Sequence, residues 1–377
     1  MKIAVNTRLL LKGRLAGIGN TTHEILRRMV KAHPEQDFLF LFDRPYAPEF
    51  IYADNVVPLT IFPQARHPFL FYWWFEWQLP RILKKHQVDL FLSPDNFLSL
   101  RSQVPSLLIL HDLAFEHYPN DLPFWHRKHY RYFVPQFAKK ANKIATVSEA
   151  SKQDICQQYG VPADKIEVIH VGLNENIAHH ASLVQQADLK QKYAKGKAYF
   201  IHVGTIQPRK NYVNLLKAFD AFKKRTGAAV QLLLIGRKGW KTSAIYKTHQ
   251  AMEHAKAVHF LHRISNRELS ILLSGALGLL CVSYFEGFGM PVIEAQCCRC
   301  PVIASKLSSI PEVAGTAALF VDPFSVEAIQ IAMTQLYKDP ALRQQLIADG
   351  FENAKRFSWN KTSQKLWGMA ESILKTV

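Results

Sequence analysis

Short apolar runs recur along the chain, and helix-length segments separate them. The runs are rich in Val, Ile, Leu and Phe and do not alternate with polar residues, which is typical of parallel strands buried on both faces. Strands are predicted at Ile3–Asn6, Phe38–Phe42, Val56–Ile61, Leu90–Ser93, Ser106–Leu110, Ile144–Val147 and Ile166–Val171, and then at Tyr199–Gly204, Val230–Gly236, Val258–Leu261, Leu279–Ser283, Pro301–Ala304 and Ala318–Val321.

Several helix starts between these runs are also predicted from local residues. Ser265 followed by Glu268 forms a capping box, and Ser148 is placed to cap the helix after it. Pro291 suits the first position of a helix whose first turn includes Glu294. Alternating strands and helices predict doubly wound α/β layers.

The alternation of predicted strands and helices is interrupted once, in the polar stretch 173–197, and resumes at Tyr199. We therefore expect two Rossmann-like domains that face each other across a cleft. The expected parts are a domain at 1–172, a linker at 173–197, a second domain at 198–355 and a crossover helix at 356–377, with the C-terminal helices packing back toward the first domain. Open α/β sheets bind ligands at the carboxyl ends of their strands, so one crevice would hold two ligands.

Composition narrows the class of protein. The 377 residues are 48% apolar and 20% charged, which excludes wholesale disorder. No apolar run approaches the ~18 residues of a membrane span, and the first residues lack the pattern of a secretory signal. Five cysteines do not make a disulfide framework, so a cytoplasmic location is expected. The net charge of +17 favours a phosphate-bearing partner, which is a nucleotide, an anionic membrane or a nucleic acid.

The most informative segment is YFEGFGMPVIEAQCCRCPVIAS, residues 284–305. Glycines that precede a helix N-terminus present backbone N–H groups suited to a phosphate. Glu286 and Glu294 flank that anion site, where carboxylates are unfavourable unless they face sugar hydroxyls. The alternative is that Glu294 complements the helix dipole and Glu286 is a loop acid.

The spacing Glu286-x7-Glu294 within EGFGMPVIEA is similar to the signature of family 4 glycosyltransferases. These are retaining enzymes of the two-domain GT-B fold that use nucleotide sugars. Other segments resemble family segments in the expected order, namely GIGNTTHEILRRM (17–29), HDLAFEHYP (111–119), TVSEASKQDI (146–155), VGTIQPRKN (203–211), LLLIGRKGW (232–240) and FLHRIS (260–265).

The resemblance implies roles for residues in the second domain. Glu294 would hold the ribose hydroxyls of the nucleotide, and Glu286 would contact hydroxyls of the transferred sugar. The N–H groups around Phe288, Gly289 and Met290 would meet the distal phosphate.

Two cations, Arg209 and Lys210, would neutralise the diphosphate, unless they belong to a solvated turn. Arg263 lies where the family places backbone contacts to the base. Many members have Gly-Arg where this chain has Gly204 and Thr205, so Arg209 would supply the missing charge.

Two features of the first domain resemble the family as well. Gly17 and Gly19 form a loop that would approach the donor phosphate and open a helix near Thr21. His111 ends a strand and is expected to hydrogen-bond sugar hydroxyls rather than act as a nucleophile, although a packed structural histidine is the alternative. Same-face attack and a covalent intermediate both stay open as routes to retention.

Metal and cofactor chemistry is not expected. The chain has no Asp-x-Asp motif, so metal independence follows as a hypothesis, with the nucleotide sugar as co-substrate and no further cofactor. Cys297, Cys298 and Cys300 lack a second ligand pair for zinc and are predicted to be core thiols. Arg299 stands where the family usually has Gly, so the end of this helix departs from the family pattern.

The acceptor side contains an aromatic segment, residues 66–86, in which Trp and Phe precede Arg and Lys. Together with the acid-free stretch 122–148, it suits the surface of an anionic membrane and a lipid-linked acceptor. The alternative is a helix packed on the sheet by its aromatic residues.

Three other classes of protein compete with this interpretation. An oxidoreductase is suggested by Gly17-x-Gly19 and by Asp43 after the second strand, but Thr22 stands where the third glycine belongs. A nucleic-acid-binding protein is suggested by the charge alone. A different GT-B enzyme, such as a sugar-nucleotide epimerase or a phosphorylase, would share the fold.

The preferred hypothesis is a retaining hexosyltransferase of bacterial polysaccharide or lipopolysaccharide synthesis. The segment PRKN resembles mannosyl- and rhamnosyl-transferring members, so GDP-mannose is the first donor expected. The acceptor is expected to be a glycan or lipid-linked, and the enzyme to sit in the cytoplasm or peripherally on the inner face of the membrane, with no nucleic-acid partner.

Overall fold

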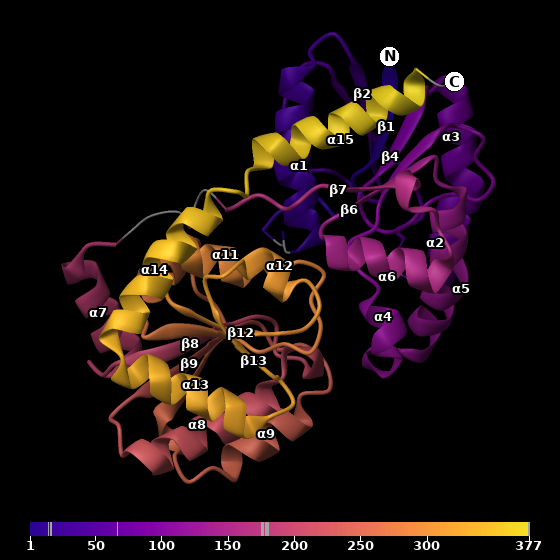
Figure 1. The fold of residues 1–377 in the computed structure, drawn as a ribbon. Helices are drawn as coiled ribbons and strands as arrows, with labels where there is room; N and C mark the ends of the chain where they lie inside the picture. The colour runs from indigo at the N-terminus through magenta and orange to yellow at the C-terminus, as the bar shows by residue number, and fades with distance from the viewer. Residues whose placement is uncertain (14, 16, 66, 175–176, 178–180, 376–377) are drawn as a thin grey trace. The chain divides into compact units, whose positions relative to one another are not determined.

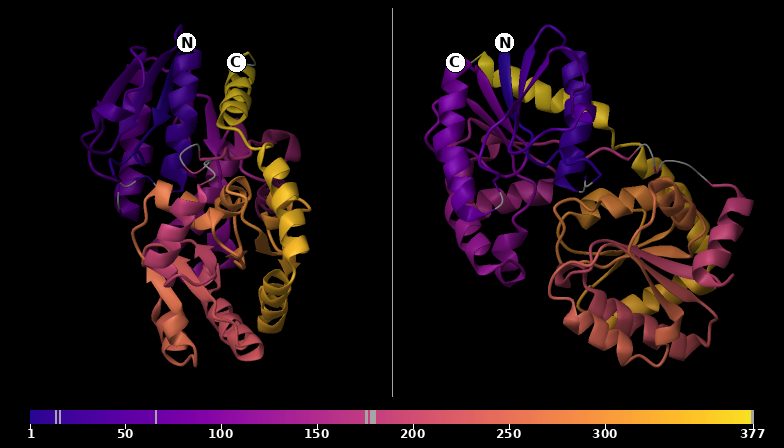
Figure 2. Two further views of the ribbon diagram at one scale, coloured as in Figure 1. Left: turned by 90° about the vertical axis from the view of Figure 1, so that its left-hand side faces the viewer. Right: turned by 180° about the vertical axis from the view of Figure 1, so that it is seen from behind.

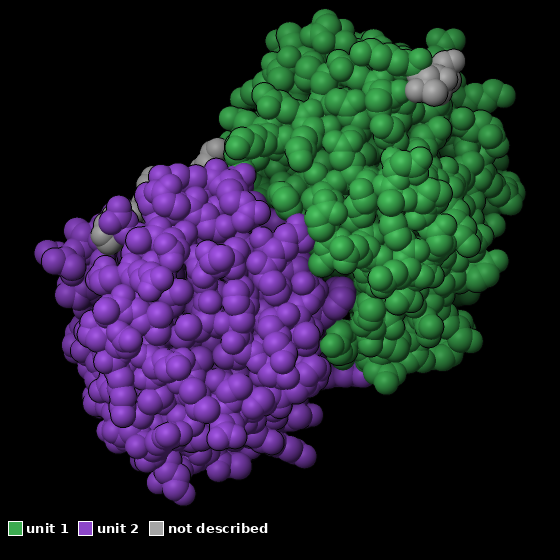
Figure 3. Space-filling view, in the orientation of Figure 1, with its two compact units in different colours: residues 1–172, 358–377 green, residues 173–357 purple. Residues whose placement is uncertain are grey.

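The computed structural model describes residues 1–13, 15, 17–65, 67–174, 177 and 181–375. Arg66 of the predicted aromatic segment, residues 175–176 and 178–180 of the predicted linker, and residues 376–377 of the predicted crossover helix lie outside the described residues. The chain forms two compact units, residues 1–172 with 358–377 and residues 173–357 (Figure 3).

Unit 1 is built on a seven-stranded parallel sheet in the order β3-β2-β1-β4-β5-β6-β7. Its strands are β1 (Lys2–Asn6), β2 (Asp37–Phe42), β3 (Val56–Thr60), β4 (Leu90–Ser93), β5 (Ser106–Ile109), β6 (Lys143–Thr146) and β7 (Ile166–Val168). The four residues of β4 and of β5 are all buried, as strands covered by helices on both faces require.

Helices flank this sheet (Figures 1 and 2). They are α1 (Ile18–Ala32), α2 (Pro68–Trp73), a π-helical turn η2 (Trp74–Gln78), α3 (Leu79–Lys85), α4 (Ala114–His117), α5 (Phe124–Lys140), α6 (Glu149–Tyr159) and α15 (Trp359–Leu374), with short 3-10 turns η1 (Pro48–Phe50), η3 (Pro119–Asp121) and η4 (Ala163–Lys165). Side chains of α2, η2, α3, α5 and α6 share one hydrophobic core with the sheet.

The last helix of the chain belongs to unit 1, where α15 packs against α1 and the sheet. Ser363 donates to the carbonyl of Ile25, and Thr362 donates to the carbonyl of His170 at 2.6 Å. A Cβ at Gly172 would lie 2.3 Å from the backbone nitrogen of Trp359. Only glycine therefore lets the two segments that join the units pass this closely.

Unit 2 is built on a six-stranded parallel sheet in the order β10-β9-β8-β11-β12-β13. Its strands are β8 (Tyr199–Val203), β9 (Gln231–Ile235), β10 (Val258–Leu261), β11 (Gly278–Cys281), β12 (Val302–Ser305) and β13 (Leu319–Val321). Its helices are α7 (Leu183–Ala194), α8 (Tyr212–Thr226), α9 (Ser243–Gln250), α10 (Asn266–Ser274), α11 (Met290–Cys297), α12 (Ile310–Ala314), α13 (Val326–Lys338) and α14 (Pro340–Ala354), with 3-10 turns η5 (Pro208–Lys210) and η6 (Ala255–Ala257).

Each predicted strand is present, with ends shifted by up to three residues. Three other predictions need correction. The expected linker contains α7, which is part of unit 2 because Tyr193 donates to Glu268 of α10 at 2.8 Å. Helix α1 begins at Ile18 rather than near Thr21. Helix α11 begins at Met290, so Pro291 is its second residue and Glu294 lies beyond its first turn.

Candidate functional site

The chain leaves the carboxyl ends of β8 and β11 in two loops that meet in unit 2. The backbones of the β8 and β9 loops approach closely, because a Cβ at Gly236 would lie 1.8 Å from the carbonyl oxygen of Gly204. The turn η5 then carries Arg209 and Lys210 toward the loop after β11, where Tyr284 N–H donates to the carbonyl of Arg209 at 3.0 Å. The turn that carries Arg209 and Lys210 and the loop after β11 thus meet at one edge of the sheet.

Glu286 is ion-paired with both cations of η5. Its Oε1 accepts from Nζ of Lys210, and its Oε2 accepts from Nη1 of Arg209 at 3.1 Å. Arg209 also donates to the carbonyl of Phe285 at 2.6 Å. The side chains of Glu286 and Lys210 are buried, so a charged cluster lies largely out of water, where it acts more strongly than an exposed pair.

The ion pairs keep Glu286 ionised. Burial by itself would raise the pKa of this carboxyl, but attraction to Lys210 and Arg209 outweighs burial and lowers the pKa to about 2. At neutral pH the loop therefore presents a carboxylate beside two cations, and its oxygens act as hydrogen-bond acceptors.

Two serines that the sequence analysis did not single out hold this loop. Ser308 Oγ donates to the carbonyl of Glu286 at 2.6 Å and accepts from its N–H at 3.3 Å. Ser309 Oγ lies 2.8 Å from the carbonyl oxygens of both Glu286 and Phe288. Both serines follow β12, the neighbour of β11. That adjacency was the signal that could have identified them.

Gly289 connects the loop to α11. Its φ is 107°, and a Cβ there would lie 2.6 Å from Cδ1 of Ile310. Glycine adopts this conformation without strain. The first N–H groups of an α-helix have no intrahelical acceptor, and Pro291 has no N–H. The backbone at Gly289 and Met290 therefore supplies the donors at this end of α11.

Glu294 lies one turn further along α11 and is buried. Within the described part of the chain its carboxyl forms neither a hydrogen bond nor an ion pair. Burial raises its pKa to about 8. A buried carboxyl without a partner is unfavourable, so Glu294 is ready to accept hydrogen bonds from a ligand.

Thr205 and Arg263 lie apart from this ion-pair cluster. Both are exposed, Thr205 after β8 and Arg263 after β10. The structure shows no hydrogen bond from either side chain to the other candidate residues described. The structure therefore joins Arg209, Lys210 and Glu286 directly and links the backbone of Glu286 to that of Phe288 through Ser309. Thr205 and Arg263 follow two strands of the same sheet, β8 and β10, which β9 separates.

The glycine loop of unit 1 is the N-terminus of α1 itself. Gly17 is the N-cap residue with a φ of 48°. A Cβ at Gly19 would lie 2.7 Å from the carbonyl oxygen of Leu9. This close approach explains the second glycine by packing alone.

His111 follows β5 and is buried. Its Nε2 lies 2.9 Å from the carbonyl oxygen of Pro94, so Nε2 carries a proton. Burial lowers the pKa of His111, which favours the neutral ring, whose Nδ1 is then an acceptor. Its neighbour Asp112 caps the N–H of Ala114 at 2.9 Å, which is a structural role.

Two of the three cysteines predicted to be core thiols are buried, whereas Cys297 is only partly buried. Cys298 donates to the carbonyl of Ile177 at 3.1 Å, and Cys300 is buried. Across the described ranges, no group of three His, Cys, Asp or Glu side chains is placed to hold a metal ion. Arg299 has a φ of 60°, so the helix ends in a glycine-like conformation although an arginine stands there.

The aromatic segment is divided between core and surface. Phe71, Trp74 and Phe75 are buried, whereas Phe69 is 74% and Trp73 46% exposed. The packed alternative therefore describes three of the seven aromatic residues between Phe69 and Trp77, and Trp77 is partly buried. Of the helices described, none is long and apolar enough to cross a bilayer.

Asp43 is not available as the ribose-binding acid that the oxidoreductase alternative requires. Asp43 is fully buried, and its two oxygens accept from Arg44 at 2.6 and 2.7 Å and from the N–H of Ala65 at 3.0 Å. Its carboxylate is therefore already satisfied by the protein and serves the structure.

Solved structures share this architecture of two parallel sheets. A glycosyltransferase from Rickettsia africae superposes with a TM-score of 0.75 over 100% of this chain and 99% of that chain, at 16% identity. HepE from Anabaena, solved with UDP and glucose, gives a TM-score of 0.75 at 18% identity over 99% and 100% of the two chains. The fold is thus the GT-B fold of glycosyltransferases.

Sequence comparison shows the family. Residues 15–176 match Glycosyltransferase Family 4, and residues 185–353 match Glycosyl transferases group 1. The chain therefore belongs to the family 4 (group 1) glycosyltransferases, as the sequence motifs predicted.

Two curated relatives are named as mannosyltransferases. The chain is 32% identical over 228 residues to O-antigen chain mannosyltransferase B of Escherichia coli, a match that spans 60% of each protein. It is 29% identical over 76% of each chain to the O-antigen chain mannosyltransferase RfbU of Salmonella typhimurium.

Proposed function

We propose that the chain is a retaining, metal-independent mannosyltransferase that takes its sugar from GDP-mannose. The observation that carries the proposal is the buried carboxyl of Glu294, which has no partner in the described chain, one turn inside a helix whose glycine-capped end adjoins Arg209, Lys210 and Glu286. In the proposal Glu294 faces the ribose, the cations and the N–H groups face the diphosphate, and Glu286 faces the sugar.

The residues of this cluster have distinct roles in the proposal. Glu294 accepts hydrogen bonds from the ribose hydroxyls, and Arg209, Lys210 and the N–H groups of Gly289 and Met290 bind the diphosphate. The bond between the anomeric carbon and the distal phosphate oxygen breaks, and negative charge grows on the leaving diphosphate. Cations and N–H groups already in place stabilise that charge.

Retention follows if the acceptor hydroxyl attacks from the face that the diphosphate leaves. Its oxygen bonds to the anomeric carbon, and its proton passes to the departing phosphate oxygen, so no separate base is required. Glu286 orients hydroxyls of the mannosyl unit, and His111 accepts a hydrogen bond from another through Nδ1. Two cations beside the diphosphate supply the charge that a divalent metal supplies elsewhere.

The mannosyl specificity and the acceptor rest on similarity. The names of the two curated relatives assign them to O-antigen chains, so the acceptor here is proposed to be a growing glycan or a lipid-linked glycan of a bacterial surface polysaccharide. Such a substrate fits a cytoplasmic enzyme in peripheral contact with the anionic inner face of the membrane. UDP and glucose bound to Anabaena HepE make a UDP-sugar the competing donor.

A donor panel tests this proposal. Thermal stability is measured with GDP-, UDP-, TDP- and ADP-sugars in the presence of EDTA, because ligand binding raises stability as the logarithm of ligand over Kd. GDP-mannose should raise the melting temperature of the wild type but not of Glu294→Ala. The control Glu352→Ala, at an exposed glutamate of the same unit, should respond like the wild type. The proposed site is contradicted if no nucleotide sugar raises the melting temperature of the wild type, or if Glu294→Ala shows the same rise.

Transfer itself is tested by the products. GDP should be released only when an acceptor glycan is present, and proton NMR of the new linkage should show the anomeric configuration of the donor. GDP release without acceptor points to hydrolysis, and inverted configuration contradicts same-face attack.

A further inference from the structure

Helices α2 and α5 of unit 1 each carry an apolar face that the core does not cover. A surface helix of a globular protein needs one apolar stripe, which faces the core. On α5 that stripe is formed by Val134, Phe137 and Ala138, all of which are buried. A second row contains Trp125 and Tyr132, which are 59% and 65% exposed.

Helix α2 repeats the arrangement. Phe71 faces the core, whereas Phe69, Tyr72 and Trp73 are exposed at i, i+3 and i+4 spacing. Of the eighteen exposed large apolar side chains described in the whole chain, seven lie on α2 and α5. This concentration is more than the scattered single exposures that are normal on a protein surface.

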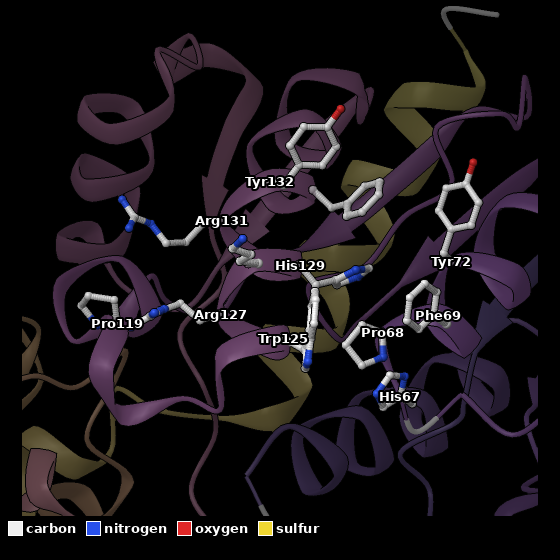
Figure 4. Close-up of a pocket in the computed structure, with 12 residues that line it drawn as sticks. His67, Pro68, Phe69, Tyr72, Pro119, Trp125, Arg127, His129, Arg131 and Tyr132 are labelled. Carbon is white, nitrogen blue, oxygen red and sulfur yellow. The ribbon is translucent and has the colours of Figure 1, made fainter.

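The outer faces of the two helices enclose a groove of about 1030 Å³, which we call the α2–α5 groove (Figure 4). Phe69 and Tyr72 line it from α2, and Trp125 and Tyr132 line it from α5. Figure 4 shows Trp125 beside Pro68, with Arg127 and Arg131 on the side away from Phe69 and Tyr72. The groove is therefore apolar along one side and cationic along the other.

The charge of the groove has one sign. Arg127, Lys128 and Arg131 line it, and none of the described residues that line it carries a carboxylate. Arg131 pairs with Glu116 at 2.8 Å, whereas no ion pair of Arg127 or Lys128 occurs among the residues described. Glu76, in the turn after α2, points its carboxylate inward to the N–H groups of Leu100 and Arg101.

One buried polar atom of the groove also lacks a partner. His129 lines the groove and is 8% exposed, and its Nε2 has no hydrogen-bond partner among the residues that the structure describes. Buried polar atoms are nearly always paired, so this ring nitrogen is available to a polar group of a ligand that reaches it.

We propose that the α2–α5 groove docks unit 1 on an anionic phospholipid bilayer and takes in part of one phospholipid. Trp125, Tyr132, Phe69 and Tyr72 contact the acyl chains at the interface, where Trp and Tyr are favoured. Arg127 and Lys128 bind the phosphate, and His129 pairs with a polar atom of the lipid backbone. The proposal deepens the membrane contact of the proposed function by assigning it to named residues.

Vesicle binding tests the charge. Sedimentation is measured with phosphatidylcholine vesicles with and without phosphatidylglycerol. A basic side chain near an anionic surface contributes about 1 kcal/mol, so the double variant Arg127→Gln/Lys128→Gln should lower partition to anionic vesicles roughly 30-fold. The matched control Lys217→Gln/Lys224→Gln, at two exposed lysines of α8, should lower it much less.

Fluorescence quenching tests the insertion. Phospholipids brominated along their acyl chains should quench tryptophan emission of the wild type, and Trp125→Phe should lose part of that quenching. Trp240→Phe, at a 47% exposed tryptophan of unit 2, should keep it.

Three results would overturn the proposal. They are equal binding to neutral and anionic vesicles, an equal loss in the α8 control, and quenching that Trp125→Phe leaves unchanged. A concentration-dependent dimer that Trp125→Ala abolishes would instead assign the groove to a second copy of the chain. These measurements need neither a sugar donor nor sugar transfer. If vesicle binding fails, the donor-binding proposal still stands, and if donor binding fails, the vesicle results still hold.

Discussion

Nη1 of Arg209 donates to the carboxylate Oε2 of Glu286 at 3.1 Å and to the carbonyl oxygen of the preceding residue, Phe285, at 2.6 Å. Lys210 binds the other carboxylate oxygen. Together they hold the acidic loop against the turn that carries the cations. A donor diphosphate would bring further negative charge to cations that are already positioned, so little reorganisation would be needed on binding.

The first prediction concerns Lys210. Lys210→Ala removes a buried cation that the proposal places beside the leaving diphosphate, and we expect kcat to fall about 10²–10³-fold. Lys217→Ala, at an exposed lysine of α8, should leave kcat unchanged. Steady-state transfer to a soluble glycan acceptor gives both numbers. A kcat for Lys210→Ala within a few-fold of the wild type would remove Lys210 from the mechanism.

The second prediction concerns the stability of the protein against pH. Burial raises the pKa of Glu294 from 4.5 to about 8, so between these values the folded state holds a proton that the unfolded state has lost. The contribution of this residue to the unfolding free energy should therefore fall as pH rises, by up to about 1.4 kcal/mol per pH unit.

Glu294→Gln removes that titration. The variant should gain stability relative to the wild type as pH rises from 5 to 8, measured by urea unfolding at several pH values. Glu352→Gln, at an exposed glutamate, should run parallel to the wild type. A constant difference between Glu294→Gln and the wild type across this range would show that Glu294 titrates normally.

The third prediction concerns the glycine that opens α11. Gly289 has a φ of 107°, and the added Cβ would lie 2.6 Å from Cδ1 of Ile310. Ile310 has a flexible end that shifts, but the backbone conformation stays unfavourable for alanine, so Gly289→Ala should destabilise the protein by about 1–3 kcal/mol and weaken donor binding.

Gly368→Ala is the matched control. Gly368 is exposed in α15, and a Cβ there meets no atom within 4 Å. Alanine favours a helix over glycine by about 1 kcal/mol, so this variant should be more stable than the wild type. Thermal melts and GDP-mannose titrations of both variants separate the effect on folding from the effect on binding.

The fold was predictable because its signal is local. Buried parallel strands are continuous apolar runs, and each run such as Leu90–Ser93 ends where the chain turns. The prediction of a linker at 173–197 was wrong because α7 has a polar surface. Ala194 is its one buried residue among those described. Its attachment through Tyr193 to Glu268 is a contact over 75 residues, which no local pattern reveals.

The site was predictable only where residues of one loop act together. Glu286, Gly289 and Glu294 belong to one motif, and Arg209 and Lys210 to another. That Glu286 would pair with both cations depends on the order of β8 and β11 in the sheet. Ser308 and Ser309 support the loop from a third strand. That Glu294 has no partner among the described residues depends on how α11 packs.

The last prediction concerns the tautomer of His111. Its Nε2 donates to the carbonyl of Pro94, so the atom available to accept a hydrogen bond from a sugar hydroxyl is Nδ1. Asparagine places a carbonyl oxygen near the position of Nδ1, whereas glutamine places its amide near Nε2. If Nδ1 acts on the donor sugar, His111→Asn should keep more of the transfer rate than His111→Gln, although His111→Gln preserves the bond to Pro94. Burial lowers the pKa of His111 below its usual value of 6.5, so the wild type should lose half of its kcat through protonation of this residue only below pH 6.5. Equal kcat values for the two variants, with equal melting temperatures, would assign His111 to packing rather than to the sugar.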